Sequence, residues 1–167
     1  MRTLLGSLRA NRDGSALIEG ALVVPVLIFL LFGVYEFSWY FYQKHVIMLG
    51  VRDAARYLAR SATPCDPDSP TWVSDEQRAK NLAVTGAVDG GALRVNGWTS
   101  QFVRTECEAI ANSVDPDGQR EYRGGASLLF VTISTRFVDP SLGFFSLLGL
   151  RAPTIFISHS ERAVGPG

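Results

Sequence analysis

The sequence predicts an α+β fold, with one long amino-terminal helix that carries a membrane span, packed on a small antiparallel β-sheet head with one additional short helix. Three observations predict it. An unbroken apolar run fills residues 20–42, an amphipathic helical pattern follows it directly, and short alternating segments occupy the last part of the chain. The 167 residues suggest one domain, or one domain with an appendage.

The apolar run "GALVVPVLIFLLFGVYEFSWYFY" contains a single charged residue, Glu36. As a helix it would be roughly 34 Å long, enough to cross a bilayer core of about 30 Å. Trp39, Tyr40 and Tyr42 gather at its far end, as aromatic residues do at a membrane interface. A cleaved signal peptide and a buried helix of a soluble protein are the alternatives. The run is longer than either usually contains, so we predict a transmembrane segment at about residues 20–42.

The helical pattern continues beyond the span to residue 62. Apolar residues recur at helical spacing and predict one buried stripe: Ile47, Val51, Ala54, Ala55, Leu58 and Ala62. Arg52, Arg56 and Arg60 form a second stripe. A solvated face is the favoured interpretation for it, with phospholipid head groups or an acidic neighbour as alternatives. Pro25 should bend or locally open the helix, and Pro64 should end it. The long helix is therefore expected over residues 15–62 and the head over residues 63–167.

The head is predicted to contain one helix and several short strands. Ser74 and Gln77 have the spacing of a capping box, which predicts a helix over residues 74–88. Alternating segments predict strands at 92–98, 101–107, 127–138 and 154–164, and residues 107–116 are interpreted as a strand end followed by a loop. The apolar connection 139–153 is interpreted as a helical turn that caps the core, with an exposed patch for a membrane or partner as the alternative.

The two cysteines, Cys65 and Cys107, both follow the apolar run. Their spacing matches no metal motif, and the two histidines, His45 and His159, lie far apart in the sequence. A disulfide is the simpler interpretation, and two buried free thiols are the alternative. A disulfide needs an oxidising compartment such as the periplasm, and would stabilise the head by on the order of 4 kcal/mol.

Motifs for catalysis or nucleic-acid binding are missing from the sequence. It contains no P-loop, dinucleotide fingerprint, G-x-S-x-G or H-E-x-x-H motif. Sixteen basic and sixteen acidic residues give a formal net charge of zero, and no basic-aromatic patch points to nucleic acid. We therefore expect no enzymatic activity, no catalytic residues, no metal or cofactor, and neither nucleic acid nor a small-molecule substrate as partner. A lone His159 is interpreted as a structural residue.

Glu19 lies at the start of the apolar run, where a carboxylate is costly if it faces lipid. A basic leader and Gly14 precede it. If the chain is cut between Gly14 and Ser15, Ser15 acquires a new ammonium group. In a bundle of parallel helices this ammonium can meet Glu19 of a neighbouring subunit and neutralise it. Glycine at the cut also offers a protease an unhindered peptide.

These elements together resemble the TadE-like family of Tad (Flp) pilus systems. The resemblance is carried by Gly14 with Glu19 five residues on, by "ALVVPVL", "LLFGVYEF" and "RDAARYLA", and by the later pieces "YRGG", "VTIS", "LLGL" and "ISHSERAV". It covers nearly the whole chain, with residues 63–120 matched only loosely. The N-terminal motif is specific as a combined pattern, although each piece alone is weak.

The resemblance implies a pilin-like fold and a pseudopilin or minor pilin of a type IV pilus. It implies that a prepilin peptidase removes leader 1–14 by cutting at Gly14–Ser15, and that other pilins or pseudopilins of the Tad system are partners. The chain would cross the bacterial inner membrane once, with a cytoplasmic N-terminus and a periplasmic head, and would be extracellular when incorporated in a pilus. The alternative is a bitopic inner-membrane binding or assembly factor that stays outside the fibre.

Overall fold

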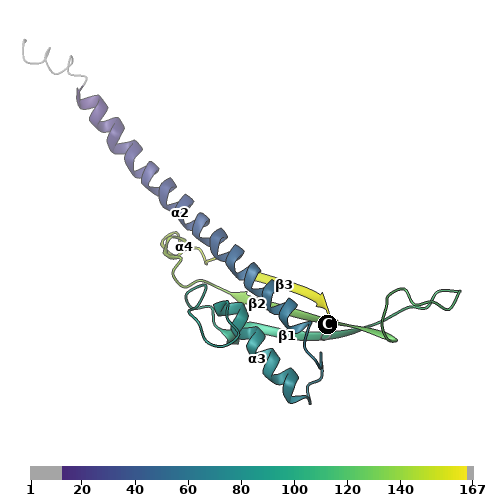
Figure 1. Cartoon of the computed structure of the whole chain (residues 1–167). Helices are drawn as coiled ribbons and strands as arrows, with labels where there is room; N and C mark the ends of the chain where they lie inside the picture. Colours follow the sequence, from purple (N-terminus) through teal and green to yellow (C-terminus); the bar gives the residue numbers. More distant parts are fainter. Residues whose placement is uncertain (1–12, 165–167) are drawn as a thin grey trace, which may run out of the picture. The chain divides into compact units, whose positions relative to one another are not determined.

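A computed structural model describes residues 13–164, so the leader upstream of Asp13 lies outside the described residues. The chain divides into two compact units, residues 1–40 and residues 41–167. Helix α2 (Asp13–Leu58) runs from the first unit into the second. The second unit also contains α3 (Pro70–Thr85), the 3-10 turn η1 (Ser100–Phe102), β1 (Val103–Ala111), β2 (Ser127–Phe137), α4 (Gly143–Leu147) and β3 (Ile155–Arg162) (Figure 1). The predicted α+β layout of a long apolar helix, a small antiparallel sheet and an additional helix is confirmed.

Helix α2 has 46 residues and is continuous through Pro25. This proline therefore does not end the helix. Its second half carries the predicted buried stripe, because Ile47, Val51, Ala54, Ala55 and Leu58 are all fully buried. The helix ends at Leu58, earlier than predicted. A tighter turn follows it, in which the Ser61 N–H donates to the Leu58 carbonyl. Ala62 therefore lies beyond the helix and is exposed.

The sheet has three antiparallel strands in the order β1-β2-β3. In its register, Val103 of β1 lies opposite Thr135 of β2, which lies opposite Ile157 of β3. One face is buried, and the alternation predicted for β2 is correct there: Val131, Ile133, Thr135 and Phe137 are buried on that face. β1 also confirms that a strand end occupies residues 107–111 and gives way to a loop.

Two predicted elements of the head differ from the structure: the start of the helix predicted over residues 74–88, and the strand predicted at residues 92–98. Helix α3 begins at Pro70, with Ser69 as its N-cap residue, so Ser74 lies inside the helix and does not cap it. Proline suits the first helical position because its fixed φ is already helical and its missing N–H is not needed there. The helix ends at Thr85, and Gly86 adopts the left-handed conformation with φ 84°.

Residues 92–98 do not form the predicted strand. They form a loop with a turn at Asn96–Gly97, where Gly97 has φ 80°. The loop is held by Trp98, which is fully buried and whose indole N–H donates to the Thr135 hydroxyl at 3.0 Å. The same hydroxyl donates to the Phe102 carbonyl at 2.8 Å. This chain of hydrogen bonds fixes the loop against the middle strand.

Candidate membrane and assembly segment

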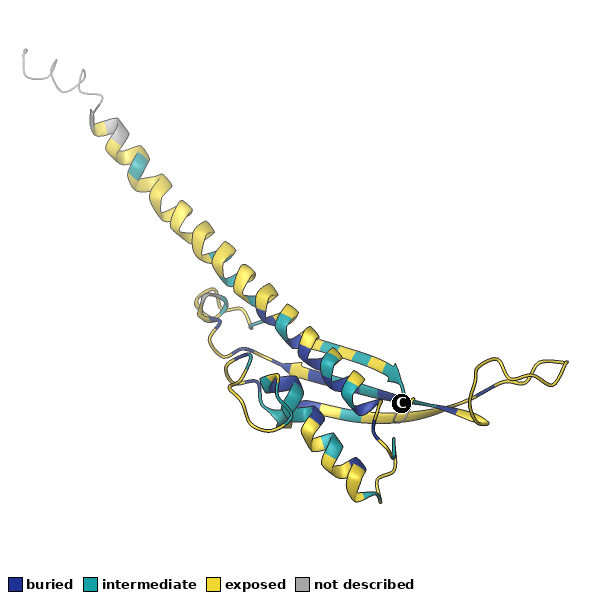
Figure 2. Ribbon diagram, in the orientation of Figure 1, coloured by how far each residue is buried: buried dark blue, intermediate teal, exposed yellow. Residues whose placement is uncertain are grey.

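The first unit exposes the apolar side chains of α2. Leu22, Leu31 and Val34 expose 70%, 67% and 67% of their surface, and their apolar neighbours in the run are also largely exposed (Figure 2). By length and composition α2 can cross a membrane, and none of its most apolar window is buried within the chain. Aqueous exposure of so much apolar surface is unfavourable at about 25 cal/mol per Å². This surface therefore needs lipid or other apolar helices around it.

Glu19 is exposed on the first turns of this helix, and Gly14 is exposed near its start. Ser15 also belongs to α2. Glu19 and Ser15 thus lie four residues, about one helical turn, apart in the same helix.

The second half of α2 is fixed to the head by close contact at Gly50. A Cβ atom at this position would clash with the Ala83 carbonyl oxygen of α3 and lie 3.0 Å from Cη2 of Trp98. Three residues further along, Asp53 accepts a hydrogen bond from the Arg94 guanidinium at 3.0 Å. The absent side chain of Gly50 allows α2 to approach α3 at backbone contact distance.

A buried polar pair joins α2 to the connection between β2 and β3. The Gln43 amide donates to the Asp139 carboxylate at 2.5 Å, and each residue exposes only 3% of its surface. Asp139 also accepts from the backbone N–H of Ser141 at 2.8 Å. Sequence reasoning missed this pair, although Gln43 lies four residues before Ile47 and so extends the buried stripe by one turn.

An ion cluster joins the end of α2 to β3. The Glu161 carboxylate lies 2.9 Å from Nε2 of His159 and 3.3 Å from Nε of Arg56. The hydrogen bond with His159 is the main cause that lowers the pKa of Glu161; the Arg56 guanidinium acts in the same direction, whereas burial opposes it. Arg52, Arg56 and Arg60 are all exposed, as the solvated-face interpretation expected. Arg56 in addition has an acidic neighbour within its own chain.

A disulfide joins Cys65 and Cys107, the pairing that the sequence favoured, with a Cα–Cα distance of 5.8 Å. Cys65 lies in the loop after α2, and Cys107 lies in β1. The bond therefore ties the segment that leaves the long helix to an edge strand of the sheet. A disulfide is consistent with an oxidising compartment for the head.

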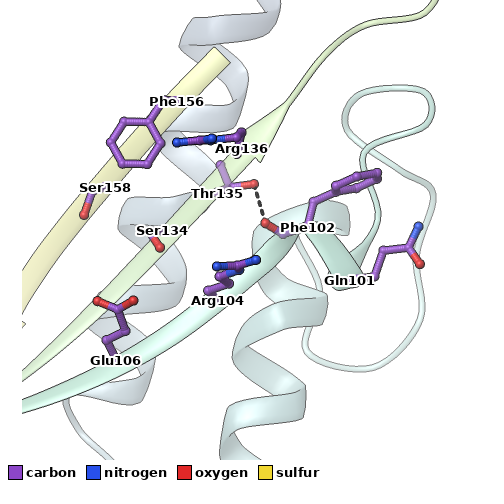
Figure 3. A pocket seen from close by; sticks show the side chains of 9 residues that line it. All are labelled: Gln101, Phe102, Arg104, Glu106, Ser134, Thr135, Arg136, Phe156 and Ser158. Carbon is purple, nitrogen blue, oxygen red and sulfur yellow. Dashed lines mark hydrogen bonds between the residues drawn. The ribbon is translucent and has the colours of Figure 1, made fainter. Parts of the chain in front are cut away.

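The face of the sheet turned away from the helices carries a shallow pocket of about 450 Å³ (Figure 3). Arg104 and Glu106 of β1, and Arg136 of β2, stand on this face, and the Arg136 guanidinium lies 5.7 Å from the centre of the Phe156 ring. Hydroxyls of Ser134 and Ser158 and the Gln101 amide also line it. The pocket is open and polar. Over residues 13–164, no group of three or more His, Cys, Asp or Glu side chains is placed to hold a metal ion.

A comparison with protein families finds one match, and it lies on the exposed helix. Residues 14–56 match the family of TadE-like proteins. The match begins at Gly14, covers Glu19 and the whole apolar run, and ends within the part of α2 that packs on the head. The resemblance that the sequence predicts is confirmed over residues 14–56. No curated protein and no solved structure matches the chain significantly.

Proposed function

We propose that this protein is a pseudopilin or minor pilin, a structural subunit in the assembly of a Tad type IV pilus. The observation that carries the proposal is the coincidence of the TadE-like match with a helix whose apolar run up to Tyr42 is largely exposed. Such a surface can be covered by lipid in a membrane-bound precursor and by neighbouring helices in a fibre. The same helix can therefore serve both states.

In this proposal a prepilin peptidase removes the leader between Gly14 and Ser15. The mature chain then begins in the first turn of α2, and its Ser15 ammonium pairs with Glu19 of a neighbouring subunit. The chain crosses the inner membrane once, with its head in the periplasm, where the Cys65–Cys107 disulfide is stable. The proposed role is structural, and requires neither a cofactor nor a catalytic residue.

The processing step is tested by N-terminal sequencing of the protein recovered from membranes of the native host. We expect a chain that begins at Ser15. Gly14→Phe places a bulky side chain at the cut and should leave the long form in the membrane. Gly20→Phe is the matched control, because Gly20 lies in the same helix beyond the proposed site and has no neighbour within 4 Å. Normal conversion of the Gly14→Phe chain to one starting at Ser15 would contradict the proposed site.

The second candidate function is that of an assembly factor that remains in the inner membrane. The Gln43–Asp139 and Arg56–Glu161 contacts favour it because they join the head to the second half of α2 within a single chain. Recovery in sheared fibres distinguishes the two functions. A structural subunit should appear in the fibre fraction, whereas an assembly factor should remain with the membrane.

A further inference from the structure

The connection between β2 and β3 contains an exposed apolar segment. Leu147, Leu148 and Leu150 expose 72%, 49% and 57% of their surfaces. From Pro140 to Leu150 the sequence contains no charged residue. Three exposed leucines within four residues are unusual in a surface connection and indicate a contact with a membrane or with another protein.

The attachment of this segment indicates which of the two it contacts. Asp139 opens the connection and is bonded to Gln43 of α2. Gln43 follows Tyr42, the last residue of the apolar run, so the connection is tethered to the helix where the proposed membrane span ends. Leu142 is buried and fixes the near end of the segment to the head. The exposed leucines follow the tethered Asp139 by eight to eleven residues, so this short connection keeps them near the end of the proposed span.

The backbone of the segment suits an interfacial position. The Gly149 N–H donates to the Ser146 carbonyl at 3.0 Å, and the Leu150 N–H donates to the Phe145 carbonyl at 2.8 Å. Gly149 has φ 69°, which allows the chain to turn back there. Because these N–H groups are bonded inside the turn, the leucines can enter the acyl boundary without carrying unpaired backbone donors into it. The exposed Arg151 that follows suits an anionic head-group layer.

We infer that residues 142–150 form a second, interfacial membrane contact, which inserts Leu147, Leu148 and Leu150 into the leaflet on the head side of the membrane. This inference rests on the membrane span of the proposed function. With two attachments, one through α2 and one through this loop, the head is held close to the bilayer before assembly.

The inference is tested with the full chain in vesicles of phosphatidylcholine and phosphatidylglycerol. The variant Leu147→Cys carries an environment-sensitive fluorophore on its new thiol, while Cys65 and Cys107 remain joined in their disulfide. Val114→Cys, in the β1–β2 loop, is the matched control because Val114 is also an exposed apolar residue, at 55%. Val34→Cys reports on the span itself. Quenching is measured with nitroxide-labelled lipids and with aqueous iodide.

We expect the label at position 147 to be quenched several-fold more by a shallow lipid nitroxide than the label at 114, which iodide should quench. Equal iodide quenching at 147 and 114 would overturn the inference and leave the span intact if Val34→Cys is quenched by lipid. Protection of position 147 from both quenchers would also overturn it, in favour of a protein contact. Failure of lipid quenching at position 34 would overturn the span and the inference together.

Discussion

Gly50 lies where the backbone of α2 touches α3, and the contact leaves no room for a side chain. Gly50→Ala adds one methyl group against the Ala83 carbonyl and the Trp98 ring. Alanine favours a helix over glycine by about 1 kcal/mol, but overpacking a core usually costs about 1–3 kcal/mol. We therefore expect the head to lose stability, measured as a lower unfolding midpoint of the full chain in detergent.

Gly20→Ala is the matched control for this change, since it makes the same substitution in the same helix with no neighbour within 4 Å. It should leave the unfolding midpoint of the head unchanged. An unchanged or higher midpoint for Gly50→Ala would show that α2 and α3 can move apart without loss.

Glu161 makes the stability of the head depend on pH. Its pKa is lower in the folded chain than its ordinary value of about 4.5, so its ion cluster stabilises the fold above that value. This stabilisation is lost as the pH falls through the folded pKa. Glu161→Gln should therefore lower the melting temperature at pH 7, by the equivalent of at most about 1 kcal/mol because the cluster is partly exposed.

The difference between Glu161→Gln and the unchanged protein should narrow and disappear as the pH is lowered below about 4.5. Thermal melts at several pH values measure it, and Glu108→Gln, on the exposed part of β1, is the control. A difference of the same size at acidic and neutral pH would mean that packing, and not the charge of Glu161, accounts for the loss.

Among the elements, β1 and the loop that follows α2 are tied by the Cys65–Cys107 disulfide across 42 residues of sequence. Replacing both cysteines with serine should destabilise the head by about 2–5 kcal/mol, because the unfolded chain regains the freedom of the closed loop. Denaturant unfolding of the full chain measures the loss of stability. Mass spectrometry after alkylation verifies that neither cysteine of the native protein reacts with the alkylating reagent. Identical unfolding with and without reductant would contradict this role.

The elements that the sequence predicted correctly are those with a regular pattern. The stripe from Ile47 to Leu58 and the alternation in β2 each repeat over several turns or residue pairs, so their buried faces could be read directly. The strand predicted at 92–98 is wrong because so short an alternating pattern does not distinguish a strand from a loop. Its conformation depends on Trp98 bonding to Thr135, 37 residues further along the chain.

The start of α3 could have been found, because Ser69 followed by Pro70 is a known helix beginning; the Ser74–Gln77 spacing occurs inside the helix by chance. The loop after β1 gave no such signal. Asn112 is buried there; its side-chain amide donates to the Tyr122 and Gly125 carbonyls, and its side-chain oxygen accepts from the Tyr122 N–H. The hydrogen-bond partners of the Asn112 side chain all lie at least ten residues away in the sequence. They come together only in the folded loop, so no local pattern could reveal them.

At the scale of the whole molecule, the uncovered half of α2 is the part that must meet other molecules. If Glu19 pairs with the Ser15 ammonium of a neighbour, Glu19→Gln leaves that ammonium buried and uncompensated. Breaking such a pair costs on the order of 3–5 kcal/mol, a factor of several hundred or more in the assembly equilibrium. We expect a normal membrane level but strongly reduced recovery in sheared fibres.

Glu36→Gln removes the same charge from the aromatic end of the same helix and should disturb assembly much less. Both variants are compared by immunoblot of membrane and fibre fractions. Equal fibre incorporation of the Glu19→Gln chain and the unchanged chain would show that this carboxylate is not the assembly contact.

The segment that includes β3 returns to the end of the long helix, where the Val164 N–H donates to the Ala59 carbonyl at 2.9 Å and Glu161 contacts Arg56. During synthesis the ribosome completes the buried stripe of α2 long before it reaches β3. The final partners of the stripe are therefore distant in the sequence, which makes folding of the head a non-local event. A chain that stops short of Ile155 lacks both contacts, leaves β2 as an open sheet edge, and would be a substrate for proteolytic quality control.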